Sequence, residues 1–151
     1  GTSTQILQSN GVAQLPSWVD AGIAATQPQM EAAVSTGVYS SPARQHFHPG
    51  HPKAWGYATI SGGVPTLGAS YNVTSITDVS AGIITWTIAT DFSSTTYSVV
   101  AGISGAASGA NNFAVSIENI AAGSFDTQVQ RDDGSDTDLV ATSMAAFGDQ
   151  A

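Results

Sequence analysis

The chain lacks cysteine and has few charged residues. No cysteine occurs in its 151 residues, which excludes disulfides, thiolate nucleophiles and cysteine-based zinc sites. Asp, Glu, Lys and Arg make up only 9%, whereas a soluble domain averages about 25%. Arg44, Lys53 and Arg131 are the three cations, against 11 acidic residues. With a net charge of -8, the chain has no basic stripe for phosphates, so we expect no nucleic-acid binding.

Long apolar runs and a targeting segment are also lacking. No run approaches the about 20 apolar residues of a membrane-spanning helix, so we expect no membrane insertion. The sequence begins at Gly1 without an initiator Met, a charged n-region or an apolar h-region. We therefore expect residue 1 to be a cut or processed end.

Small residues dominate what is present. Ser and Thr number 35, Ala 23 and Gly 16, which together are about half of the chain. This composition is typical of extended, β-rich and often fibrous extracellular chains. The length allows one domain with a core, or a small domain with an extension that packs on a partner.

Residues 1–40 predict a connector made of a β-hairpin and a short helix. Asn10-Gly11 favours a two-residue type I′ turn between apolar arms. Because a two-stranded unit is unstable alone, we expect it to pack on the main domain or on neighbouring copies. Further along, Thr26 and Gln29 have the spacing of a capping box, and the segment 35–37 (Ser-Thr-Gly) predicts the end of that helix.

Residues 41–52 hold three prolines and all three histidines, which predicts an ordered linker without a regular element. Beyond it, 53–151 shows short apolar segments separated by Gly, Asp, Asn and Ser clusters. This spacing predicts an all-β fold, an antiparallel β-sandwich. The expected strands are 54–60, 69–76, 83–90, 97–103, 113–117, 124–130 and 139–147.

In two of the expected strands, apolar and polar residues alternate regularly enough to predict which face is buried. Ile84, Trp86 and Ile88 share one face, with threonines on the other. In the later strand, Phe125 and Val129 are expected to face inward together with Thr127, a polar exception. Asp126 and Gln128 are expected to point outward.

Four motifs occur in a fixed order along the chain. They are QILQSNG (5–11) followed by PSW (16–18), TQPQMEA (26–32), KAW (53–55) with SYNVTSITD (70–78), and DF (91–92) with YSVV (97–100). In this order they resemble the motifs of bacteriophage tail-fibre and related virion-appendage proteins. The resemblance covers nearly the whole chain.

The resemblance implies a structural virion protein on a tail or surface appendage, outside the cell. It implies an intertwined homotrimer, contacts with other tail or appendage proteins, and attachment to a host cell-surface glycan or protein. Receptor contacts are expected in loops rich in Ser, Thr and Asn. The candidate residues are Ser93, Ser94, Thr95, Thr96, Ser104, Asn111 and Asn112.

His46 and His48 form a candidate metal site. Residues at i and i+2 lie on the same side of an extended chain, and three chains would supply six imidazoles, which suit Fe, Ni, Zn or Cu. Some phage fibres use an H-x-H pair along the trimer axis, so the resemblance implies a transition metal at the threefold axis. The alternative is a rigid linker whose ring nitrogens hydrogen-bond to backbone. No other cofactor is expected.

The acidic run 131–138 has two interpretations. Its carboxylates are the hard ligands that Ca²⁺ prefers, although their spacing does not match an EF-hand loop. Asp133-Gly134 also predicts a simple turn between two strands.

We expect no enzymatic activity. The sequence contains no Gly-x-Ser-x-Gly, and its histidines stand together in one linker. The carboxylates considered for glycan cleavage are Glu31, Asp78, Asp91 and Glu118, of which Asp78 and Asp91 occupy ordinary turn positions.

The alternative function is a bacterial extracellular carbohydrate-binding or adhesin module. Such a module is more often monomeric and has exposed aromatic side chains for stacking on sugars. The aromatic candidates are Trp18, Trp55, Tyr57, Tyr71, Trp86 and Tyr97. We expect Trp86 in the core, Trp55 in the core or an interface, and Trp18 against a neighbouring chain.

Overall fold

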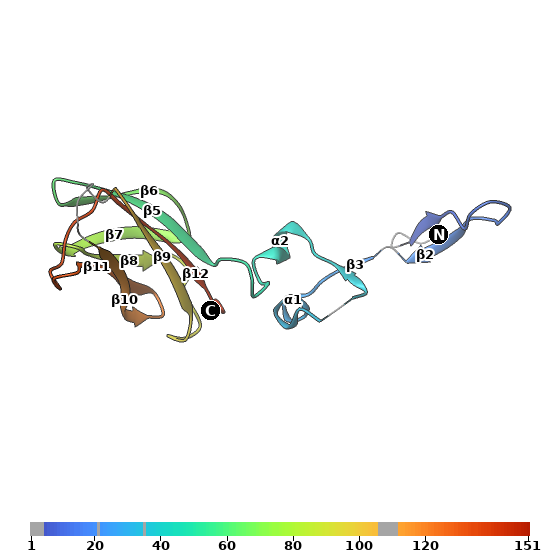
Figure 1. Ribbon diagram of the computed structural model, residues 1–151. Coiled ribbons are helices and arrows are strands. Elements are labelled where there is room, and N and C mark those ends of the chain that lie inside the picture. The colour runs from blue at the N-terminus through green and yellow to red at the C-terminus, as the bar shows by residue number, and fades with distance from the viewer. Residues whose placement is uncertain (1–4, 21, 35, 106–111) are drawn as a thin grey trace. The chain divides into compact units, whose positions relative to one another are not determined.

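The computed structural model describes residues 5–20, 22–34, 36–105 and 112–151. The chain is mostly β, with antiparallel sheets, and it divides into two compact units, Gly1–His48 and Pro49–Ala151 (Figure 1). The division falls inside the proline-rich segment 41–52. No helix among the described residues has the length and apolar character needed to cross a membrane.

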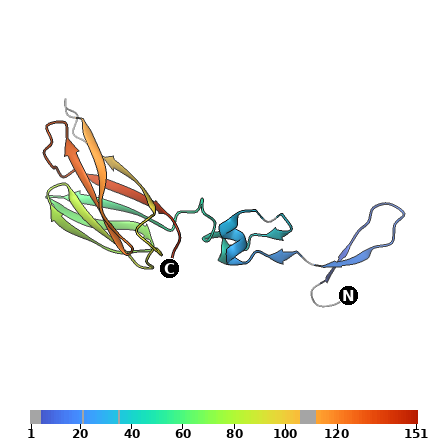
Figure 2. The same ribbon diagram turned by 90° about the horizontal axis from the view of Figure 1, so that it is seen from below.

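The first unit contains the expected hairpin, but its turn differs from the prediction. Strands β1 (Gln5–Gln8) and β2 (Ser17–Asp20) pair antiparallel, with Gln8 opposite Ser17 (Figure 2). The predicted two-residue turn at Asn10-Gly11 is therefore wrong, because the loop spans residues 9–16. The Asn10 side-chain amide donates to the Leu15 carbonyl at 2.8 Å and to Ser17 Oγ at 3.1 Å, and these bonds close the wider loop.

The predicted helix start is confirmed, and the predicted helix end is wrong. Helix α1 (Gln27–Ala32) begins with a capping box, in which Gln29 Oε1 accepts the Thr26 backbone N–H at 2.9 Å. It ends at Ala33, which adopts a left-handed conformation with φ 52°, before the Ser-Thr-Gly segment. Flanking it, β3 (Ile23–Ala24) and β4 (Val38–Tyr39) pair in parallel.

The proline-rich segment contains one regular element that the sequence did not indicate. Helix α2 (Pro42–Gln45) forms a single turn, and the backbone N–H of Gln45 donates to the Ser41 carbonyl at 3.2 Å. Pro42 fits the first turn because the missing N–H has no partner there. The prediction of a linker without regular structure is wrong at these four residues.

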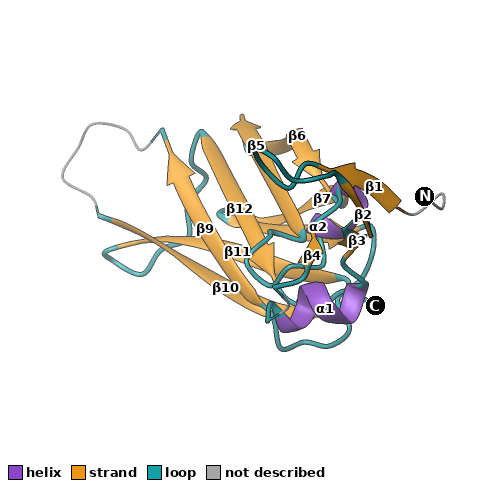
Figure 3. Cartoon of the chain, turned by 90° about the vertical axis from the view of Figure 1, so that its right-hand side faces the viewer, coloured by secondary structure: helices purple, strands orange, loops and turns teal. Residues whose placement is uncertain are grey.

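The second unit has two four-stranded sheets (Figure 3). One has the order β10-β11-β8-β7 and the other β6-β5-β12-β9, with antiparallel neighbours throughout. The strands are β5 (Ala54–Ser61), β6 (Val64–Tyr71), β7 (Val73–Ser80), β8 (Ile83–Ile88), β9 (Ser98–Ser104), β10 (Phe113–Ala121), β11 (Ser124–Arg131) and β12 (Ala141–Phe147).

Strand β6 is the element that the sequence prediction missed. The predicted strand 69–76 is wrong as one element, because Asn72, with φ 55°, separates the end of β6 from the start of β7. The Asn72 side chain accepts from the Thr90 backbone N–H at 2.7 Å and donates to the Lys53 carbonyl at 3.0 Å, which holds the turn. Pro65 is tolerated because β6 is an edge strand of its sheet.

Side chains of both sheets form one core. Ile84, Trp86 and Ile88 are buried as predicted, and the Trp86 indole packs so closely on Gly56 of the other sheet that an added Cβ would lie 2.7 Å from it. Phe125, Thr127 and Val129 are also buried. Their inward orientation is therefore confirmed.

Asp126 points outward as expected, but side chains of the neighbouring strands cover it. Only 8% of it is exposed, because its carboxylate accepts from the Thr85 hydroxyl at 2.5 Å and from the Asn119 amide at 2.7 Å. Neighbouring strands supply both donors, so the carboxylate is covered on the sheet surface while remaining hydrogen-bonded.

The strand directions give the second unit two distinct ends. At one end, which we call the entry end, Lys53 leads into β5, and the Ser93 backbone N–H donates to the Asp149 carbonyl at 2.8 Å. The far end lies at the opposite tips of the strands and carries the segments 62–63, 81–82 and 132–140. A strand such as β9, with seven residues, separates the ends by about 20 Å.

Candidate functional site

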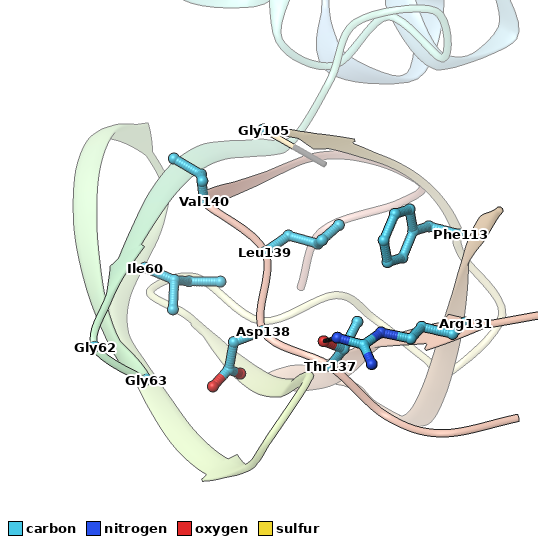
Figure 4. A pocket seen from close by; sticks show the side chains of 10 residues that line it. All are labelled: Ile60, Gly62, Gly63, Gly105, Phe113, Arg131, Thr137, Asp138, Leu139 and Val140. Atoms are coloured by element: carbon cyan, nitrogen blue, oxygen red, sulfur yellow. Dashed lines mark hydrogen bonds between the residues drawn. The ribbon is translucent and has the colours of Figure 1, made fainter. Parts of the chain in front are cut away.

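A pocket with a volume of about 370 Å³ lies at the far end (Figure 4). Its walls come from the turn after β5, the start of β10, the end of β11 and the segment that leads into β12. The lining residues are Ile60, Gly62, Gly63, Gly105, Phe113, Arg131, Thr137, Asp138, Leu139 and Val140. The lining combines apolar side chains (Ile60, Phe113, Leu139 and Val140) with polar ones. We call the exposed polar residues Arg131 and Asp138 the polar rim. Such a mixed lining suits a ligand with both apolar and hydroxylated surface.

Hydrogen bonds hold the polar rim in place. Arg131 Nη2 donates to Thr137 Oγ1 at 3.0 Å, and Asp138 Oδ1 accepts from the Gly82 backbone N–H at 2.7 Å. The guanidinium retains further N–H donors and the Asp138 carboxylate a further oxygen. The rim therefore offers donors and an acceptor to a polar ligand.

The acidic run folds as a turn next to this pocket. The hydroxyl and the backbone N–H of Ser135 both donate to the Asp133 carboxylate. These hydrogen bonds lower the pKa of Asp133, and the bond from the hydroxyl has the larger effect. Asp136 accepts from the Gln128 and Gln130 amides at 2.9 and 3.0 Å. The carboxylates of Asp133, Asp136 and Asp138 thus each have their own protein donors. Among the described residues no three potential ligands come together for a metal ion. This geometry favours the turn interpretation over a calcium site in one chain.

After this turn the chain does not continue as the second arm of a long hairpin. Gln130 and Asp136 form one antiparallel bridge, and the Arg131 backbone N–H donates to the Ser135 carbonyl at 2.9 Å. Strand β12 then joins the other sheet. The predicted strand 139–147 begins two residues later, at Ala141.

The structure separates the candidate receptor residues into two groups. The exposed segment 93–96 lies at the entry end, where β9 begins. Ser104 and Asn112, both exposed, lie at the far end near the pocket. Asn111 lies outside the described residues. The candidates therefore do not form one surface. The rim residues Arg131 and Asp138 belong to the run 131–138, whose sequence indicated a turn or a calcium site but not a pocket.

His46 and His48 lie in the first unit, and their backbone differs from the expected extended form. His46 caps α2 with φ -65° and ψ -18°, and the His48 backbone N–H donates to the Gln45 carbonyl at 3.0 Å, as in a helical turn. The His46 ring packs on Phe47, with ring centroids 3.8 Å apart. The assumption of an extended chain that placed both imidazoles on one side is wrong, and a metal at a threefold axis stays a prediction.

Three aromatic side chains share the outer face of the β6-β5-β12-β9 sheet. Trp55 and Tyr71 are directly opposite on β5 and β6, and Tyr57 follows two residues along β5. Their exposed fractions are 41%, 45% and 43% respectively. Trp55 is therefore outside the core of its own chain, whereas Trp86 is fully buried as expected.

Tyr97 and Trp18 occupy different settings. Tyr97 stacks on Phe92 with centroids 4.0 Å apart, and its hydroxyl donates to the carbonyls of Ala121 and Ser124 at 2.8 and 3.1 Å. Burial raises the pKa of Tyr97 to about 12. Trp18 lies on β2, in the first unit, and is half-exposed.

Three of the four carboxylates considered for glycan cleavage lie apart, and the fourth, Glu118, lies on β10 opposite Asp126 of β11. Glu31 is in the first unit and accepts from the Gln27 amide at 2.8 Å. Asp78 lies near the far end of β7, while Asp91 follows β8 at the entry end. Asp78 and Asp91 therefore cannot flank one glycosidic bond, which requires carboxylates within about 10 Å.

Comparison with models of known protein families, with curated proteins and with solved structures found no match for this chain. The resemblance to phage fibre proteins thus rests on the sequence motifs alone.

Proposed function

We propose that this chain is a structural component of a phage virion, in a tail fibre or related appendage, and that it assembles as a homotrimer. In this proposal the two sheets form a β-sandwich, and the first unit is a connector that intertwines with its copies. The chain binds other appendage proteins and contributes to attachment at the host surface. It has no catalytic role.

The observation that carries the proposal is the uncovered apolar surface of the hairpin. Ile6 and Leu7 are neighbours on β1, so they point to opposite faces, yet they are 54% and 57% exposed. Leu15 and Trp18 add further exposed apolar surface. A two-stranded hairpin with neither face covered is not stable alone, and three copies would bury this surface against one another.

Host attachment is proposed at the far end of the second unit. The connector enters at Lys53, so the far end is the part of this unit most distant along the strands from that entry. It carries the pocket with Arg131 and Asp138 on its rim, together with Ser104 and Asn112. A host glycan or a polar protein loop fits this mixture of apolar and polar lining.

Native mass spectrometry of the whole chain, without chelator, tests the assembly. We expect a trimer of about 46 kDa, three times the 15.3 kDa chain. Leu7→Lys places a charge in the hairpin surface, and we expect it to shift the trimer toward monomer. Gln8→Lys, at an exposed neighbouring position, is the matched control and should remain trimeric. A wild-type monomer contradicts the proposal, and a mass excess of one transition metal would support the His46 and His48 site.

One observation favours the second candidate, a carbohydrate-binding or adhesin module. Trp55, Tyr57 and Tyr71 lie exposed on one sheet face, and aromatic faces stack on sugars. A monomeric chain that binds a glycan array, with binding lost in Trp55→Ala and retained in Trp18→Ala, would support this function in place of the fibre proposal.

A further inference from the structure

We propose that the outer face of the β6-β5-β12-β9 sheet is a subunit interface, covered by neighbouring copies of this chain. This inference rests on the proposed homotrimer and identifies the surface of the second unit that takes part in it. We call this surface the neutral face. Its outward residues are Trp55, Tyr57 and Thr59 of β5, Tyr71 of β6, Ser143 and Ala145 of β12, and Val100 and Gly102 of β9.

Strand pairing places these residues in rows across the sheet. At one level Tyr71, Trp55, Ala145 and Val100 stand side by side on four successive strands. At the next level Tyr57, Ser143 and Gly102 are adjacent. Large aromatic side chains thus stand beside small ones, which leaves hollows that side chains of a partner can fill.

The strands of this sheet contain no charged residue at all. They also lack Asn, Gln and His, since their sequences are AWGYATIS, VPTLGASY, SVVAGIS and ATSMAAF. The strands of the other sheet carry charges, including Asp78, Glu118 and Arg131. Depletion of charge with enrichment of exposed aromatics is the composition found at the core of protein interfaces.

The distribution of charge over the chain suits a second copy as the occupant. Each copy has a net charge of -8, so two copies repel each other wherever their acidic surfaces approach. The neutral face is a surface on which such copies can meet without placing like charges in contact. Acidic residues in the second unit lie instead on the other sheet and on turns, as Asp78, Asp132 and Asp149 do.

A glycan fits the neutral face less well than a second copy does. Sugar sites combine aromatic stacking with polar groups that hydrogen-bond to the hydroxyls. Around Trp55 and Tyr57 the sheet supplies only Ser, Thr and Tyr hydroxyls, because its strands contain no amide, carboxylate or cationic side chain. The pocket rim with Arg131 and Asp138 has such groups, so we assign polar ligands to the far end.

The dimensions of the sheet agree with an interface. Four strands with eight residues in β5 give an outline of about 27 Å by about 19 Å at ordinary strand spacings. Side chains that project from the sheet make its accessible surface larger than this flat outline. The face therefore supplies most of the surface that one partner contributes to a standard interface, which is about 800 Å².

Single-cysteine variants test the inference, because the natural chain has no cysteine and each label is unique. Val100→Cys places a thiol on the neutral face, where Val100 is 62% exposed in the single chain. Thr77→Cys, on an exposed position of β7 in the other sheet, is the matched control. Maleimide labelling rates are measured on the assembled full-length chain and divided by the rates in denaturant.

We expect the Val100→Cys thiol to label at least tenfold more slowly than the Thr77→Cys thiol in the trimer, with equal rates in denaturant. Equal rates in a chain that native mass spectrometry shows to be trimeric would overturn this inference and leave the proposed function standing. A monomeric wild-type chain would overturn both. Tyr57→Lys gives a second readout, since a buried lysine should weaken the trimer at least tenfold whereas Thr77→Lys should not.

Discussion

The indole Nε1–H of Trp86 donates a hydrogen bond to Thr127 Oγ1 at 3.0 Å. Both side chains are buried, Trp86 on β8 and Thr127 on the adjacent β11. This bond explains why a threonine occupies an inward position among Phe125 and Val129. A buried indole needs an acceptor for its N–H, and a threonine supplies one without adding a charge.

Replacing Thr127 by Val should destabilise the fold by about 1 to 3 kcal/mol, the cost of leaving a buried donor without an acceptor. The two side chains have nearly equal volume, so loss of packing contributes little. Urea unfolding monitored by tryptophan fluorescence gives the free energy of unfolding. Thr127→Ser keeps the hydroxyl and should be less destabilising. If Val were tolerated better than Ser, the hydrogen bond would not be the reason for this threonine.

Gly82→Ala should be far more damaging than Gly134→Ala. Both glycines have positive φ, +75° and +79°, so both substitutions share the backbone strain of about 1 to 2 kcal/mol. At Gly82 an added Cβ would also lie 2.6 Å from the Thr137 backbone nitrogen, whereas Gly134 faces open space. We expect Gly82→Ala to lose about 4 kcal/mol or more. Equal melting temperatures for the two variants would contradict the close packing at the far end.

Tyr97 should make stability dependent on alkaline pH. Burial raises its pKa to about 12 in the folded chain from 10.0. Between these values the unfolded chain releases the phenolic proton while the folded chain keeps it, so stability falls as pH rises from about 10 to about 12.

At neutral pH, Tyr97→Phe should cost about 1 kcal/mol through the lost hydrogen bond. The free energy of unfolding of the wild-type chain should therefore fall relative to that of the Phe variant between pH 8 and pH 12, as measured by urea unfolding. A constant difference would contradict the shifted pKa.

Calcium should leave the melting temperature unchanged. The carboxylates of Asp133, Asp136 and Asp138 each accept from different protein donors, so they do not converge on one ion. Thermal unfolding in millimolar CaCl₂ and in millimolar MgCl₂ should give the same curve as in buffer alone. An increase of several degrees with Ca²⁺ alone would restore the calcium interpretation of the acidic run.

Part of the fold follows directly from local patterns. The alternation around Trp86 predicts a buried strand face, and the spacing of Thr26 and Gln29 predicts a helix start, because both signals depend on neighbours along the chain. Turns were less predictable. Asn10-Gly11 favours a tight turn, yet hydrogen bonds from the Asn10 side chain to residues further along close a wider loop.

The candidate site could be predicted only in its components. Sequence reasoning identified Ser104 and Asn112, but it gave no sign that Arg131, Asp138 and Phe113 line one pocket, because Phe113 and Arg131 meet only through the pairing of β10 with β11 and Asp138 lies on the segment that leads into β12. Likewise, Trp55 and Tyr71 stand alone in the sequence and become neighbours only when β5 and β6 pair.

The sequence by itself determined the all-β character, the scarcity of charge, the absence of cysteine and the buried positions of the most regular strands. These properties depend on composition and on the two-residue period of a strand. The tertiary structure alone decided that β6 is an edge strand that accepts Pro65, that Asp126 is covered, and that one sheet presents an uncharged aromatic face. Such features arise from which strands pair across the fold, and that pairing joins residues whose separation along the chain carries no local signal.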